Sequence, residues 1–226
     1  MANLLSSSQH IISTMIKTPG TQTFFCTVPF YQDHIEVTVT RNASIVERWI
    51  GQIIHIHRCR LHKLLIGLDI EWRATNNPNI TPPSTALLQL CVGRRCLLFQ
   101  LLHANYIPDS LHAFLGNPNF SFLGVGVHGD VLKLFKDYGL YVANPVDLNK
   151  LALLVREDEE YGRIGLKRMA YEVLGKVMTK PFNVTMSEWD AEVLVYEQVE
   201  YAAIDAFVSF ELGINLFSEL FNGIVY

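Results

Sequence analysis

Residues 34–41 alternate between apolar and polar side chains. A period of two is typical of a β-strand that buries one face. The preceding run, residues 24–31, is rich in aromatic and β-branched residues, and only residues 32–33 separate the two runs. The pattern therefore predicts a β-hairpin near the N-terminus.

The apolar spacing then changes to a helical one. A single helical face runs from Ile45 to Ile54, and Ser44 with Glu47 three residues later forms a possible capping box at its start. Three strand-like runs follow, at residues 64–72, 86–92 and 96–101. A tight link at residues 93–95 joins the last two, which must therefore pair antiparallel.

The second half of the chain is mostly helical. We expect a short helix opened by Pro108, a strand at 121–127, and helices at 130–138, 145–155, 166–174 and about 191–220. Strands that come first and mix later with helices indicate an α/β fold with a mixed sheet. We expect a tail at residues 1–20, a loop at 76–83 and one domain over residues 21–226.

Composition narrows the class of protein. Half of the 226 residues are apolar and 18% are charged, which fits a globular core and excludes a disordered chain or a coiled coil. No apolar run is long enough for a membrane span. The four cysteines lack zinc-site spacing, so we expect free thiols in the cytosol or nucleus. Since the net charge is −4, binding of phosphates would need clustered Lys and Arg or bound metal.

The first group of candidate residues is Asp69 and Glu71. They stand at positions i and i+2 near the end of an apolar strand, so both side chains point to the same face. Two like charges this close are costly unless a cation neutralises them. The alternative is an exposed edge strand with two solvated acids.

The second candidate, Asp130, follows a glycine-rich turn at residues 124–129. An aspartate at a helix start is also a common helix-dipole partner, which is an equally good explanation. The turn reads GxGxxG, with Asp147 about twenty residues on, as in dinucleotide-binding folds. The negative charge of Asp130 directly after the last glycine argues against a bound pyrophosphate.

The third group lies on the last helix. Tyr201 and Asp205 are one turn apart and share a face with Gln198. Taken alone, they also fit an ordinary amphipathic helix. Together, four carboxylates and one tyrosine provide the hard oxygen ligands that suit two Mg²⁺ or Mn²⁺ ions, and such a pair can hydrolyse a phosphodiester.

These segments resemble the motifs of the tyrosine-containing DEDD 3′–5′ exonucleases, in particular the Werner-syndrome exonuclease domain and the short plant Werner-like exoribonucleases. The resemblance spans about residues 60–216. One departure is Val193, where family members often have proline. The matching segments are Leu68–Trp72, Ala86–Cys91, Gly124–Asp130, Gly165–Lys167, Leu174–Gly175, and Ser187, Trp189, Leu194 and Gln198 together with Tyr201–Asp205.

The resemblance implies a ribonuclease H-like fold, a mixed sheet with one antiparallel strand flanked by helices. It implies two Mg²⁺ ions, replaceable by Mn²⁺, with Asp69 bridging both, Glu71 and Asp205 on the ion that activates water, and Asp130 on the other. Tyr201 would orient the attacking water. The products would be nucleoside 5′-monophosphates.

It further implies single-stranded RNA, or DNA, as the substrate and a homohexamer as the assembly. The hairpin could supply an interface of this hexamer. Argonaute proteins are expected as partners, and the expected location is the cytoplasm, with the nucleus as the alternative. An alternative function is a catalytically silent binding or scaffold protein with the same fold. For Arg94–Arg95 and Lys167–Arg168, phosphate contact and solvated surface charge both stay open. The candidate substrate contacts are Trp72, His128, Lys167 and Gln198.

Overall fold

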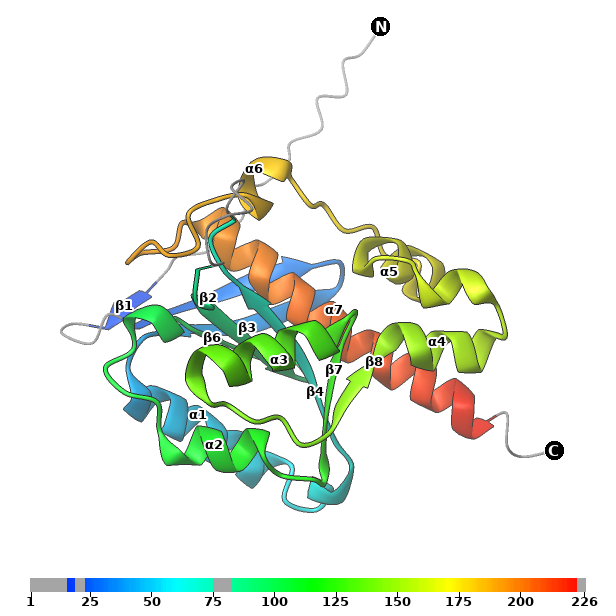
Figure 1. Ribbon diagram of the computed structural model, residues 1–226, viewed down its shortest axis with the longest axis horizontal. Coiled ribbons are helices and arrows are strands. Elements are labelled where there is room, and N and C mark those ends of the chain that lie inside the picture. Colours follow the sequence, from blue (N-terminus) through cyan, green and yellow to red (C-terminus); the bar gives the residue numbers. More distant parts are fainter. Residues whose placement is uncertain (1–15, 19–22, 75–82, 223–226) are drawn as a thin grey trace, which may run out of the picture.

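The computed structural model describes residues 16–18, 23–74 and 83–222. Most of the predicted tail and loop therefore lie outside the described residues. The described chain forms one eight-stranded sheet in the order β1-β2-β3-β6-β5-β4-β7-β8 (Figure 1). The strands are β1 (Ile16–Thr18), β2 (Thr23–Phe30), β3 (Asp33–Thr40), β4 (Leu64–Glu71), β5 (Leu87–Val92), β6 (Arg95–Phe99), β7 (Phe120–Gly124) and β8 (Pro145–Asp147).

The sheet is mixed, as predicted. β4 pairs parallel with β7 and antiparallel with β5, and β5 pairs antiparallel with β6. The predicted hairpin is confirmed, because β2 pairs antiparallel with β3, which joins β6 in parallel. The expected fold class is therefore present, with one correction. One antiparallel strand was predicted, but both β5 and β2 run antiparallel to their neighbours, because the hairpin extends the same sheet.

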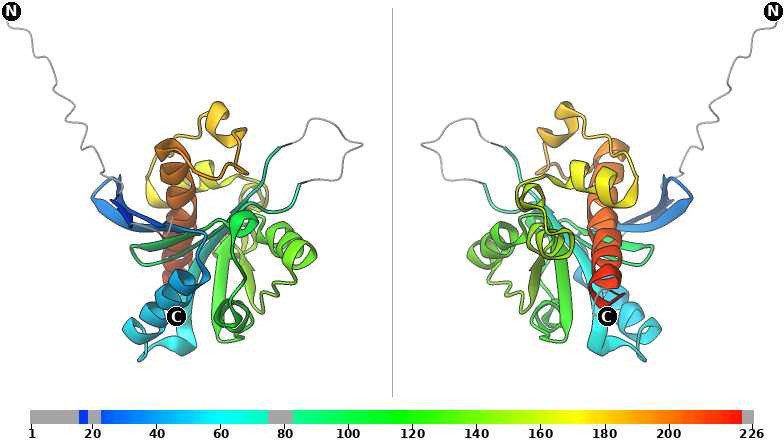
Figure 2. Two further views of the ribbon diagram at one scale, coloured as in Figure 1. Left: turned by 90° about the vertical axis from the view of Figure 1, so that its left-hand side faces the viewer. Right: turned by 90° about the vertical axis from the view of Figure 1, so that its right-hand side faces the viewer.

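Helices cover both faces of the sheet (Figure 2). One core cluster packs α4, α5 and α7 against one face, and the other cluster packs α1, α2 and α3 against the opposite face. The helices are α1 (Ala43–Ile56), α2 (Asp109–Leu115), α3 (Val127–Tyr138), α4 (Leu148–Arg156), α5 (Leu166–Leu174), α6 (Phe182–Thr185) and α7 (Tyr196–Asn222), with short 3₁₀ turns at Leu61–Lys63, Leu101–His103 and Glu159–Gly162.

Two predicted helix starts are wrong. The segment expected as one helix from 145 opens with β8, which pairs parallel with β7, and α4 begins only at Leu148, where the Asp147 side chain accepts a hydrogen bond from the Asn149 N–H. α1 is capped by Asn42 rather than Ser44, because the Asn42 side chain accepts from the Ser44 N–H.

Other boundaries shift by a few residues. The strand expected to reach 127 ends at Gly124, and α3 begins at Val127 after Gly126, whose φ of 70° suits glycine. The helix expected from about 191 begins at Tyr196.

All four cysteines are free thiols, and three of them are buried. In the described ranges, no helix is both long and apolar enough to cross a membrane.

The contact between α7 and β4 is unusually close at Gly67. A Cβ atom at this position would lie 1.9 Å from the backbone oxygen of Ala206 and 2.8 Å from the backbone nitrogen of Phe210. Only glycine fits, because backbone atoms cannot move aside as a flexible side chain can. The helix therefore lies directly on the strand that carries Asp69 and Glu71.

We expect Gly67→Ala to destabilise the protein by roughly 2–3 kcal/mol or more, the cost of overpacking against backbone. Urea denaturation measures the change. Gly51→Ala is the matched control, because Gly51 is exposed on α1 with no atom within 4 Å of an added Cβ; it should stabilise the helix by about 0.5–1 kcal/mol. Equal stability of Gly67→Ala and wild type would show that the close contact is not maintained in solution.

Candidate active site

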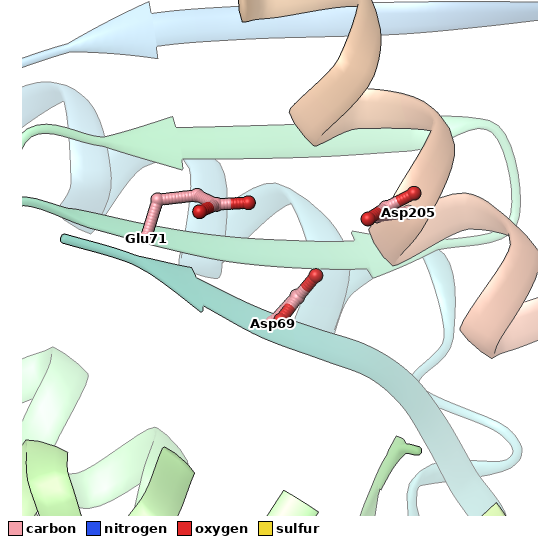
Figure 3. Close-up of side chains that lie close together, drawn as sticks. All are labelled: Asp69, Glu71 and Asp205. Carbon is pink, nitrogen blue, oxygen red and sulfur yellow. The ribbon is translucent and has the colours of Figure 1, made fainter. Parts of the chain in front are cut away.

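Three of the four predicted acids meet at one point of the fold. Asp69 and Glu71 extend from β4, and Asp205 reaches them from α7 (Figure 3). One carboxylate oxygen from each residue lies within 4.8 Å of the other two. Asp205 is buried, at 2% exposure, and the other two are half-buried. The alternative of two solvated acids on an edge strand is wrong, because β4 is an interior strand covered by α7.

The electrostatics of these acids favour a bound cation. Burial, and after it the charges of Asp205 and Asp130, raise the pKa of Asp69 well above its usual value. Burial and the charge of Asp69 raise the pKa of Glu71 to about 9. These carboxylates thus lack enough positive charge nearby to hold all of them ionised at neutral pH.

Asp130 lies in the first turn of α3 and is not one of the three clustered residues. Its charge nevertheless raises the pKa values of both Asp69 and Glu71, which places it in their vicinity. Burial and then Asp147 raise its own pKa to about 7. Asp130 is therefore a fourth acid beside the cluster, at a greater distance than the other three.

Tyr201 lies one turn before Asp205 on α7, as predicted, and only 8% of it is exposed. Burial raises the pKa of Asp205. The charge and hydrogen bond of Lys180, and a hydrogen bond with the Tyr201 side chain, oppose this effect. Burial and the charge of Asp205 raise the pKa of Tyr201 to about 12. The phenol is therefore neutral at physiological pH and can donate a hydrogen bond.

Lys180 is the principal site residue that the sequence pattern does not reveal. Its ammonium donates to Asp205 Oδ2 at 2.5 Å and lies 5.1 Å from the centre of the Tyr201 ring. Burial lowers the pKa of this ammonium, but attraction to Asp205 outweighs burial and the net shift is upward. Lys180 stands in the loop between α5 and α6, where no periodicity marks it. It supplies one positive charge to a cluster of several acids.

Two of the predicted substrate contacts lie near the acids in the chain and are accessible. Trp72 directly follows β4 with 36% of its surface exposed, and Lys133 Nζ lies 5.3 Å from the centre of its ring. His128 is exposed in the first turn of α3, two residues before Asp130. Both side chains are available to a bound molecule.

The other two predicted contacts are placed differently. Gln198 is buried: its Oε1 accepts from the Val195 N–H, and its Nε2 donates to Ser187 Oγ and to the Glu188 carbonyl. These bonds hold the start of α7, and a substrate contact would require breaking them. Lys167 is exposed on α5.

The basic pairs are engaged with neighbouring acids. Arg94 bonds Asp33, Arg95 bonds Glu36, and Arg168 bonds Glu160 and Glu172. These three arginines therefore form ion pairs at the surface. This favours their interpretation as solvated surface charges over phosphate contacts.

Fold and site together define a ribonuclease H-like α/β protein with an acidic centre on its interior strand β4. The family model described as "3'-5' exonuclease" matches residues 51–220. The chain therefore belongs to the 3′–5′ exonuclease family. This membership agrees with the sequence argument against a dinucleotide site at the glycine-rich turn.

Individual relatives agree with this assignment. The chain is 32% identical over 181 residues to a 3′–5′ exonuclease of Arabidopsis thaliana, which covers 78% of this chain and 62% of the relative. It is 30% identical over 160 residues to the bifunctional 3′–5′ exonuclease/ATP-dependent helicase WRN of Mus musculus, which covers 70% of this chain and 11% of the relative. The chain thus spans less than two thirds of the length of these relatives.

Solved structures support the fold. Escherichia coli RNase D aligns with a TM-score of 0.62 at 22% identity, over 76% of this chain and 43% of that one. At this identity the likeness shows the ribonuclease H-like arrangement alone.

Proposed function

We propose that this protein is a metal-dependent 3′–5′ exonuclease that shortens single-stranded nucleic acid to nucleoside 5′-monophosphates. The observation that carries the proposal is the meeting of Asp69, Glu71 and Asp205 within 4.8 Å in a chain of the 3′–5′ exonuclease family. Hard carboxylate oxygens in a site short of positive charge fit Mg²⁺ or Mn²⁺.

Asp69, Glu71, Asp205 and, beside them, Asp130 would hold the divalent cations. When bound, the ions lower the pKa of the attacking water and stabilise the departing oxygen. Tyr201, as a neutral phenol beside Asp205, would orient the water by its hydroxyl. Lys180 would exchange its bond to Asp205 for a phosphate oxygen of the substrate, and Trp72 would pack against the terminal base or sugar.

We further propose RNA as the preferred substrate, a homohexameric assembly, a role in small-RNA clearance with Argonaute proteins, and a cytoplasmic location. The support for these points is the resemblance of the motifs to plant Werner-like exoribonucleases. Size-exclusion chromatography with light scattering tests the assembly, and a monomer at micromolar concentration would contradict it.

One assay tests activity, polarity, sugar preference and metal need together. Matched single-stranded RNA and DNA, labelled at either end, are incubated with Mg²⁺, Mn²⁺ or EDTA. We expect 3′-labelled strands to release labelled mononucleotide first, 5′-labelled strands to shorten stepwise, and EDTA to stop both. Binding of RNA without cleavage under every metal condition would favour the scaffold alternative.

Stability of the cation-free protein should depend on pH. Folding raises the pKa values of Glu71 to about 9 and of Asp130 to about 7, while unfolded carboxyls titrate near pH 4. The folded state therefore binds more protons in this window, so stability falls as the pH rises from 5 to 9. In EDTA we expect a lower melting temperature at pH 8.5 than at pH 5.5, and Mn²⁺ should restore most of the loss. A melting temperature at pH 8.5 that does not change when Mn²⁺ is added would contradict the metal assignment.

A further inference from the structure

One buried side chain beside the site has no evident role in the fold. Gln89 lies in the middle of β5 with 0% exposure. Neither its Oε1 nor its Nε2 has a hydrogen-bond partner within the described part of the chain. A carboxamide offers two donors and two acceptor lone pairs, and leaving such a group unsatisfied in a core is strongly unfavourable. A buried polar group without a partner calls for an explanation, and a functional role is one of them.

The strand register places Gln89 next to the acids. Gln89 pairs directly with Asp69 across the antiparallel β4–β5 ladder, and Leu87 pairs with Glu71. Directly opposed residues point to the same face of a sheet, with Cβ atoms about 4.5–5.5 Å apart. Gln89 therefore faces α7 from the same side as Asp69, within reach of its carboxylate.

The immediate surroundings of Gln89 otherwise offer apolar contacts. Its neighbours on the same face of β5 are Leu87 and Cys91, and its partner on β6 is Leu98; all three belong to the core cluster under α7. A leucine at position 89 would suit this surface better than a glutamine does. The fold alone thus gives no reason for an amide here.

The carboxylate opposite has capacity to accept. Asp69 Oδ1 takes a hydrogen bond from the Ile70 N–H of its own strand at 2.9 Å. A carboxylate offers about four lone-pair positions, so this bond leaves positions for both a cation and a further donor. Carboxylates that bind metals are commonly fixed by hydrogen bonds from neighbouring side chains.

We propose that Gln89 is a positioning residue of the metal site, whose Nε2 donates to the Asp69 carboxylate and fixes the orientation in which that carboxylate faces the cation. The inference rests on the proposed nuclease function. The amide lacks a partner among the described residues, so we assign its bond to Asp69 to the cation-bound state. Gln89 contacts neither water nor substrate in this role and acts through Asp69 alone.

Gln89→Leu separates this role from a structural one. In EDTA we expect the variant to melt a few degrees higher than wild type, because a buried amide without partners is replaced by a side chain that suits the core. Its Mn²⁺ affinity, measured by calorimetric titration, should fall by about 10-fold or more, as for other supporting partners of metal ligands. A gain in stability joined to a loss of metal affinity is not expected of a residue that only packs.

Asn215→Leu is the matched control. Its Oδ1 also lacks a partner among the described residues, and it lies on α7 ten positions beyond Asp205. This change should leave the Mn²⁺ affinity at the wild-type value. Gln89→Met, which keeps the length of the side chain, provides a second variant if the branched leucine disturbs the strand.

The outcomes are distinguishable. A wild-type protein that binds no Mn²⁺ and cuts no RNA or DNA overturns the proposed function. A wild type that binds Mn²⁺ while both Gln89 variants bind it equally well overturns the role of Gln89 alone. If both variants melt well below wild type in EDTA, the amide is satisfied within the fold and the proposal fails as well.

Discussion

The Asp69→Asn variant is expected to lose at least about three orders of magnitude in the rate of oligonucleotide degradation, which corresponds to roughly 4 kcal/mol of activation free energy. Asp69 is at the centre of the site: it is one of the three carboxylates within 4.8 Å of one another, and it also interacts with the charge of Asp130. Asparagine keeps the shape but removes the charge that a shared metal ligand needs. The measurement is single-turnover release of mononucleotide in Mg²⁺.

The same variant should gain stability in EDTA. Burial, and after it the like charges of Asp205 and Asp130, raise the pKa of Asp69 and so disfavour an ionised group at this position. Asparagine cannot ionise and avoids this penalty. Asp109→Asn, which changes an exposed acid at the start of α2, is the control and should alter neither property. Wild-type degradation by a folded Asp69→Asn protein would refute the assignment of the acids.

The second large effect is expected from Tyr201→Phe. Removing only the hydroxyl should slow turnover by about 10²–10³-fold, in the range for groups that position or transfer a proton. The ring should stay in place, because its centre lies 5.9 Å from the centre of the Trp189 ring and 5.1 Å from the Lys180 ammonium. Calorimetric Mn²⁺ affinity should remain near the wild-type value.

This split between turnover and metal binding is the informative part of the Tyr201 experiment. A parallel loss of turnover and Mn²⁺ affinity would mean that the hydroxyl supports the acids rather than the attacking water. A pH–rate profile adds a check, because the pKa of Tyr201 is raised to about 12. The activity of wild type should therefore show no titration of this phenol between pH 6 and 9.

Much of the fold could be predicted because local signals agreed with it. Strict alternation marked β3, the tight link at residues 93–95 required β5 and β6 to be antiparallel, and Gly175 ends α5 with a φ of 65°. β8 could not be found in this way. It has only three residues and starts with Pro145. Proline is also favoured at the first position of a helix, so the residue does not distinguish the two structures. Only the pairing with β7 identifies the strand.

The site divides in the same manner. Strand and helix spacing placed Asp69 with Glu71, and Tyr201 with Asp205, on shared faces. The resemblance to the exonuclease motifs then predicted that the two groups meet in one site. Lys180 could not be predicted, because a loop has no period and its position depends on how α5 and α6 are joined. Gln89 did carry a signal, namely one polar residue in an otherwise apolar strand, but its importance depends on the register with Asp69.

The glycine at position 67 has a consequence for the cation itself. Asp69 is two residues from Gly67 on the strand, and Asp205 is the neighbour of Ala206, the residue that Gly67 touches on the helix. The separation of these two acids is thus set by the close backbone contact between Gly67 and Ala206. Such packed contacts have low compressibility. We therefore expect the separation of these two carboxylates to change little when a cation binds.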